Sequence, residues 1–185
     1  MSLTLSLTLS NRDLKYFRQA LRMAREAVKD AEASEIIEAT RLVFDEIKRA
    51  DPLPDFVAKR IPQLETLILM LEDKEWALPR LERERLLATF VYFGDPEDLI
   101  PDDIPVIGYI DDVIMIELVV RELRHALDAY NDFCQFRDNY ARQHKTGLTA
   151  AARKQRLRKK REQLHARMKR RLQRDLKGKR PSPLW

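Results

Sequence analysis

The chain has 185 residues, and its 35 Lys+Arg against 30 Asp+Glu give a formal charge of +5, so its length fits one domain or two small ones. Apolar residues make up 44% and charged residues 35%, with only 4 Gly, which excludes wholesale disorder and is typical of helices with solvated faces. The single cysteine excludes a disulfide framework and a cysteine-based zinc cluster.

Residues 1–10 form an N-terminal arm that repeats the sequence SLTL. The arm contains neither Lys nor Arg and no long apolar core, so we expect no signal peptide. No segment reaches the roughly 18 uninterrupted apolar residues of a membrane span, because Asp111 and Asp112 interrupt the nearest candidate, 104–120. These features predict a soluble, cytoplasmic protein.

A helical bundle is expected over residues 11–147, and it begins with two apolar stripes at helical spacing. The first stripe runs over 14–31 and the second over 36–47, so either one kinked helix or two would carry them. The segment 51–55 breaks the pattern, because each of its two Pro residues disfavours helix in the residue before it. A further helix is expected after this break, with Pro62 as a boundary or a kink.

Two longer helices are expected next. The first runs over 81–93 and ends in an unusually apolar run, which predicts a central position. The second is expected as one continuous helix over 111–143, because its apolar residues keep 4-3-4 spacing throughout. Gly147 is a natural stop, and Thr149 can start a last helix to about Leu176. With no convincing pair of strands, the predicted fold class is all-α: a small helical bundle with a central helix–turn–helix and a long basic C-terminal helix.

The turn between these two helices has the sequence DPEDLIPDDIP, and VIGYIDD follows it. An apolar helix end, an Asp-x-Ile-Pro-type turn and a Gly-Tyr-x-Asp-Asp helix start resemble the YkvA family, also called the DUF1232 domain, over residues 86–124. Gly94 and Glu97 depart from the usual pattern and alter the first cap of the turn, not its overall form. The resemblance implies a small helical unit. Because the family is largely uncharacterised and some relatives are membrane-associated, it implies almost nothing about a reaction.

The same turn concentrates carboxylates, which supports an alternative function. Clustered carboxylates can hold Mg²⁺ or Ca²⁺, and a bound metal can activate water, so the alternative is a metal-dependent hydrolase. The spacing does not fit an EF-hand, and Asp residues that start turns and cap helices explain the cluster without a ligand. We therefore expect no metal, no cofactor and no catalytic residue. The candidate ligands of the alternative are Asp95, Asp98, Asp102, Asp111 and Asp112.

Other catalytic arrangements are poorly supported. His125, His144 and His165 lie in different segments, and none has a second His four residues later, as a helical zinc site requires. Cys134 lies within a predicted helix, and we expect it to pack there rather than to react.

Residues 148–185 form the predicted basic helix and tail. Residues 141–185 carry a net charge of +15, whereas residues 1–140 carry −10. In this helix a narrow apolar stripe, from Leu157 to Leu172, lies opposite most of the Lys and Arg side chains. Such an asymmetry is typical of a partner-binding tail.

Nucleic acid is the partner that this charge pattern favours, because dense Lys and Arg bind phosphates through counterion release. The tail lacks aromatic residues before Trp185, so we expect RNA or DNA binding without sequence specificity. The prediction is a non-enzymatic accessory or adaptor protein that binds nucleic acid or a nucleic-acid machine. An acidic protein surface and peripheral contact with an anionic membrane are further possible partners. The residues predicted to contact phosphate are Arg153, Lys154, Arg156, Arg158, Lys159, Lys160, Arg161, Arg167, Lys169, Arg170, Arg171 and Arg174.

Overall fold

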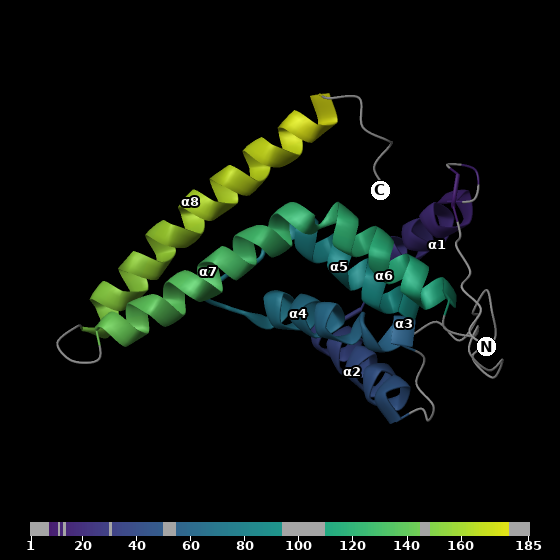
Figure 1. Ribbon diagram of the computed structural model, residues 1–185, viewed down its shortest axis with the longest axis horizontal. Helices are drawn as coiled ribbons and strands as arrows, with labels where there is room; N and C mark the ends of the chain where they lie inside the picture. Colours follow the sequence, from purple (N-terminus) through teal and green to yellow (C-terminus); the bar gives the residue numbers. More distant parts are fainter. Residues whose placement is uncertain are drawn as a thin grey trace.

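The computed structural model describes residues 8–10, 12, 14–29, 31–49, 55–93, 110–144 and 149–177. Within these ranges all regular secondary structure is helical, which confirms the all-α prediction (Figure 1). Most of the N-terminal arm and the whole turn at 94–109 lie outside the described residues. The helices are α1 (Leu14–Ala27), α2 (Ala33–Arg49), α3 (Asp55–Ala58), α4 (Ile61–Glu72), α5 (Arg80–Phe93), α6 (Ile110–Glu122), α7 (Arg124–Gln143) and α8 (Ala150–Lys177).

The two N-terminal apolar stripes belong to two separate helices that both pack against α5. Helix α1 buries Phe17 and Leu21, while Phe44 of α2 meets Phe90 of α5 edge to face, with ring centroids 6.4 Å apart. Thr40 of α2 is also buried, and its hydroxyl donates to the carbonyl of Ile36 at 2.7 Å, so its polar group is satisfied within the helix. The stripes are therefore bundle contacts.

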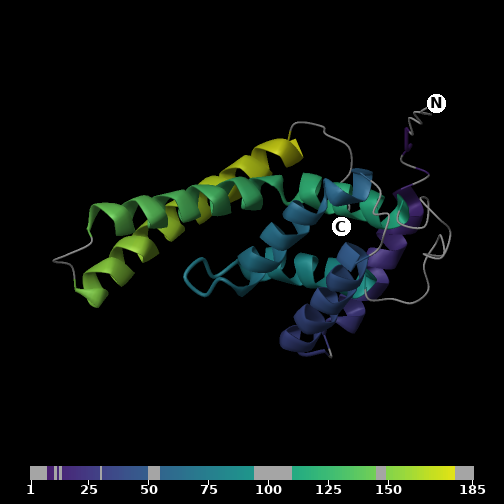
Figure 2. The same ribbon diagram turned by 60° about the horizontal axis from the view of Figure 1, so that its bottom comes forward.

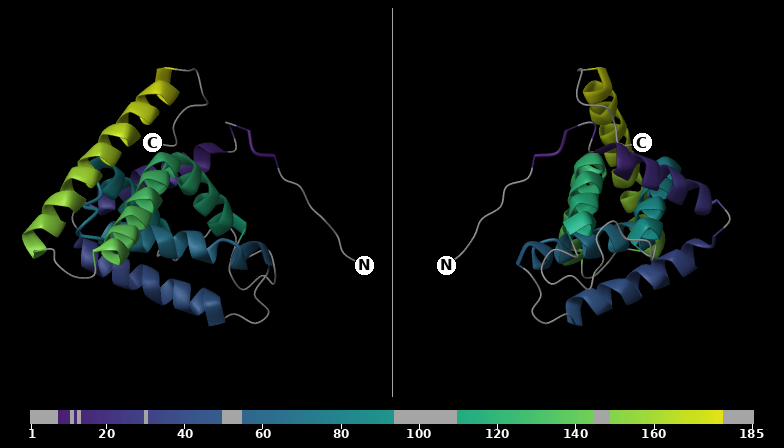
Figure 3. Two further views of the ribbon diagram at one scale, coloured as in Figure 1. Left: turned by 60° about the vertical axis from the view of Figure 1, so that its left-hand side comes forward. Right: turned by 90° about the vertical axis from the view of Figure 1, so that its right-hand side faces the viewer.

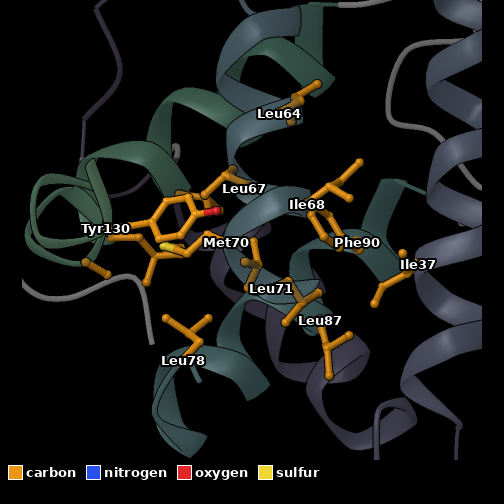
Figure 4. Packing of buried hydrophobic residues seen from close by; sticks show 14 of the residues in the cluster. Ile37, Leu64, Leu67, Ile68, Met70, Leu71, Leu78, Leu87, Phe90 and Tyr130 are labelled. Atoms are coloured by element: carbon orange, nitrogen blue, oxygen red, sulfur yellow. The ribbon is translucent and has the colours of Figure 1, made fainter. Parts of the chain in front are cut away.

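Helix α4 supplies the centre of the hydrophobic core (Figure 4). Pro62 lies in its first turn, where a missing amide hydrogen costs no helical bond. Met70 and Leu71 are buried near the end of this helix, and Phe90 of α5 and Tyr130 of α7 belong to the same buried cluster. The apolar run at the end of α5 is central, as its composition predicts.

The prediction of one continuous helix over 111–143 is wrong. The chain turns at Leu123, whose φ of −88° and ψ of 8° end α6 and begin α7. Leu123 is itself buried, so the turn keeps the apolar face of both helices against the core. Periodicity alone did not reveal the break, because the buried residue at the turn preserves the 4-3-4 phase.

Helix α8 folds back along α7, and the two form a hairpin (Figures 1 and 2). Both views show the loop end of this hairpin extending past the other helices. Helix α2 lies on the opposite side of the molecule from α8 (Figure 3). Among the described residues, no helix combines the length and the apolar character needed to cross a membrane.

Candidate functional site

The inward face of α8 carries an apolar anchor. Leu157, Leu164 and Met168 are all buried and belong to the same hydrophobic cluster as the bundle core. At about 100° per residue these three positions fall within an arc of about 40°. The apolar stripe seen in the sequence is therefore what attaches α8 to the body.

One edge of α8 forms ion pairs with acidic residues of α7. The guanidinium of Arg167 pairs with the carboxylate of Asp132, and Arg171 pairs with Asp128 at 3.4 Å. These acids lie four residues apart on α7, and their partners lie four residues apart on α8, so the pairs fix the register of the hairpin.

The first half of α8 contacts Glu75, in the link between α4 and α5. Arg153 donates from Nη1 to a Glu75 carboxylate oxygen at 2.6 Å, and Arg161 donates to the Glu75 carbonyl at 3.2 Å. On the same edge as Arg167 and Arg171, Lys160 Nζ lies 5.1 Å from the centroid of the Phe136 ring, a cation–π contact. The body therefore uses several of the basic side chains of α8 for docking.

Near its C-terminal end α8 contributes an acid instead. Asp175 accepts a hydrogen bond from Arg124, and its carboxylate lies 2.7 Å from Nε2 of His125. Both partners lie in the first turn of α7. A charged contact thus holds the open end of the hairpin, where α7 begins and α8 ends.

Trp76 is the point at which the α4–α5 link meets both helices of the hairpin. Its side chain is fully buried, and its ring centroid lies 5.7 Å from Tyr130, 5.3 Å from Phe133 and 4.4 Å from His165 of α8. Asp73 holds the link in shape, because its Oδ1 accepts the amides of two following residues at 2.9 and 3.0 Å.

His165 is partly buried against the edge of Trp76. Burial, and secondarily the charge of Arg161, lowers the pKa of His165 to about 4. The imidazole is therefore neutral in the folded protein near neutral pH. In the unfolded chain it accepts a proton below about pH 6.5.

This difference predicts a pH dependence of stability. As the pH falls from about 7 to about 5, the unfolded state binds a proton that the folded state excludes, and the free energy of unfolding should fall by about 1 kcal/mol, a figure reduced for partial exposure. His165→Phe should remove this part of the dependence. Urea unfolding of both proteins across this range measures the difference, and parallel pH curves for the two would contradict the assignment.

The outward face of α8 presents cations that contact no acid within the described part of the chain. Arg156, Lys159, Arg170, Arg174 and Lys177 are all exposed, and at about 100° per residue they fall within an arc of about 60°. At 1.5 Å per residue this array is about 32 Å long. It is a linear array of positive charge facing away from the docking contacts.

The residues that the sequence predicts to contact phosphate therefore fall into two groups: those that contact the body and those that stay exposed. Arg153, Arg161, Arg167 and Arg171 contact polar groups of the body, and Lys160 contacts an aromatic ring. The predicted residues that remain exposed are Lys154, Arg156, Arg158, Lys159, Lys169, Arg170 and Arg174. Lys177 also belongs with the exposed array; helical periodicity places it on the basic face, but it is not among the residues predicted to contact phosphate.

The alternative metal site lies mostly beyond what the structure describes. Asp95, Asp98 and Asp102 lie outside the described residues, and so does the side chain of Asp112. Asp111 is buried at the start of α6. In the described ranges, no three His, Cys, Asp or Glu side chains come together as a metal site.

Cys134 is half-buried on α7. Burial raises the pKa of its thiol, although a hydrogen bond with Tyr130 and the charge of Arg137 act in the opposite direction. A thiol with a raised pKa holds little of the reactive thiolate. These surroundings agree with the expectation that Cys134 packs.

Comparison with known proteins gives one match. No curated protein and no solved structure matches the chain. The model of DUF1232, described as a protein of unknown function, matches residues 85–118. In this segment Leu86, Phe90, Met115 and Ile116 are buried, so its described part builds the core. Residues 85–118 are therefore similar to the DUF1232 family, as the resemblance in the sequence indicates, and the basic helix lies outside the matched segment.

Proposed function

We propose that this protein is a non-enzymatic accessory protein that binds RNA or DNA through phosphates, using the outward face of docked α8. The observation that carries the proposal is the exposed array of cations from Arg156 to Lys177. Its length of about 32 Å is close to one turn of a B-form duplex. Such an array fits the repeated charge of a nucleic-acid backbone.

The docking contacts support this proposal. Polyanions are repelled by acidic side chains, and the body beneath α8 carries Asp128, Asp132 and Glu75. These carboxylates are paired with arginines of α8 itself. The helix therefore neutralises the acids nearest to it and still keeps a free basic face.

The composition of α8 supports recognition of the backbone rather than of the bases. The helix contains no Phe, Tyr or Trp, the residues on which exposed bases stack. Arginines on the outward face offer a planar fork that suits phosphate oxygens. Binding is then steeply dependent on salt and tolerant of sequence.

The test removes the free cations and leaves the docking contacts intact. In the triple variant Arg170→Gln, Arg174→Gln and Lys177→Gln, the log–log slope of affinity against salt for a mixed-sequence duplex should shrink by about 2.7, because each phosphate contact contributes about 0.9. Fluorescence anisotropy across a salt titration measures the slope.

The matched control removes the same charge from exposed positions on other parts of the body: Arg49→Gln, Lys59→Gln and Arg121→Gln. We expect this control to bind like the unmodified protein. A salt-independent affinity, or an equal loss in both triple variants, would contradict the proposal.

A further inference from the structure

Helix α1 carries a second cationic stripe. One basic residue directly follows each position of the apolar seam of α1, which is made of Leu14, Phe17, Leu21, Ala24 and Val28. The basic stripe therefore repeats at 3-4-3-4 spacing and continues just past the end of the helix. The seam itself packs against α5, which leaves the stripe along its flank. The residues of the stripe are Lys15, Arg18, Arg22, Arg25 and Lys29.

The C-terminal half of this stripe lines a hollow of about 890 Å³ between α1 and the start of α5. Glu26 and Glu84 are its acidic lining residues, which leaves an excess of two positive charges. Arg80 at its rim has 92% of its side chain exposed. The cationic lining residues are Arg22, Arg25, Lys29 and Arg80.

The acids in this hollow do not block an anionic ligand. Lys29 pairs with Glu26 at 2.5 Å and Arg80 with Glu84 at 2.7 Å, and the cation of each pair is mostly exposed. Exposed pairs of this kind contribute little free energy. A phosphate can therefore compete for the cations at small cost, and Arg22 pairs with no carboxylate in the described ranges.

The hollow at α1 shares the first turn of α5 with a surface of α8. The first turn of α5 separates it from a second hollow of about 510 Å³, which Leu81 and Glu82 line from one side and Lys169 and Leu172 of α8 line from the other. The ridge between the two is this first turn of α5, which carries Leu81, 42% exposed. The cationic stripe of α1 thus lies on one side of this turn, and Lys169 of α8 lies on the other.

We propose that the hollow at α1 is the second half of one polyanion-binding surface. A nucleic-acid strand or duplex bound to α8 crosses the first turn of α5 and places phosphates against Arg22, Lys29 and Arg80. This inference rests on the proposed function of α8 and adds to it the requirement for a polymer. A single nucleotide is too short to contact both helices, whereas a chain of phosphates reaches across the ridge.

The test is the triple variant Arg22→Gln, Lys29→Gln and Arg80→Gln, with duplexes of two lengths. A mixed-sequence duplex of about three helical turns should bind about tenfold or more weakly, with a salt slope smaller by about 2.7. A duplex shorter than about one turn, which can be held by α8 alone, should bind within about twofold of the unmodified protein.

Comparison with three further variants makes the outcome decisive. Arg22→Lys, Lys29→Arg and Arg80→Lys together keep the charge and should keep the affinity, which excludes a loss caused by misfolding. If the glutamine triple binds both duplexes normally while the α8 triple loses binding, the inference at α1 fails and the proposed function stands. If neither triple loses binding, both fail. A loss equal to that of the control at Arg49, Lys59 and Arg121 would also overturn the inference.

Discussion

Replacing Trp76 with alanine is expected to lower the free energy of unfolding by about 3–5 kcal/mol. The indole is fully buried and packs against Tyr130 and Phe133 of α7 and His165 of α8. Its loss would leave a cavity where the α4–α5 link meets the hairpin. Urea unfolding followed by far-UV circular dichroism measures the change.

The matched control is Trp76→Phe. The indole Nε1 has no hydrogen-bond partner in the part of the chain that the structure describes, so phenylalanine loses size and no hydrogen bond. We expect the control to cost less than half as much as alanine, since the remaining ring still fills most of the space. Equal costs for the two substitutions would show that packing around Trp76 is not what stabilises this junction.

Replacing Asp73 with alanine is expected to cost about 3 kcal/mol, because it removes the closer carboxylate partner of a partly buried cation and the acceptor of two turn amides. Arg137 then keeps its longer pair with Glu75, at 3.3 Å. The Asp73 side chain is only 10% exposed. One of its oxygens accepts from Arg137 at 2.7 Å and from the hydroxyl of Tyr130 at 3.3 Å, and the other caps the turn that carries Trp76.

A double-mutant cycle separates the ion pair from the turn. Adding Arg137→Met to Asp73→Ala removes the cation that has lost its closer partner, so the double variant should recover a measurable part of the loss. Asp73→Asn keeps an oxygen acceptor for the turn but loses the charge, and it should be intermediate. Strictly additive effects of the two substitutions would contradict a direct coupling between Asp73 and Arg137.

Local sequence patterns predict most of the helices. They fail where a helix ends at a buried apolar residue and not at a Pro or Gly. The pair of Pro residues before α3 and Pro62 in α4 act through their own backbone chemistry, so the sequence reveals the boundaries. Leu123 ends a helix with no such residue. Its backbone geometry is imposed by contacts with distant parts of the chain, and one sequence does not contain that information in local form.

The basic surface of α8 and α1 can likewise be predicted only in part from the sequence. The apolar stripe of α8 is visible in the sequence, and so is the alternation of apolar and basic residues on α1. What the sequence does not reveal is the docking partner of each charged side chain. Arg161 interrupts the apolar stripe for no local reason, and the structure explains it through the Glu75 carbonyl, 86 residues earlier in the chain.

The α7–α8 hairpin also has room to grow at its loop end. Since the loop end of the hairpin extends past the other helices, both helices can be lengthened together by whole heptads without altering a contact inside the bundle. Each added heptad would extend the cationic array by about 10 Å. Homologues that bind longer stretches of polymer are therefore expected to differ first in the length of the α7–α8 hairpin, with helices α1 to α6 unchanged.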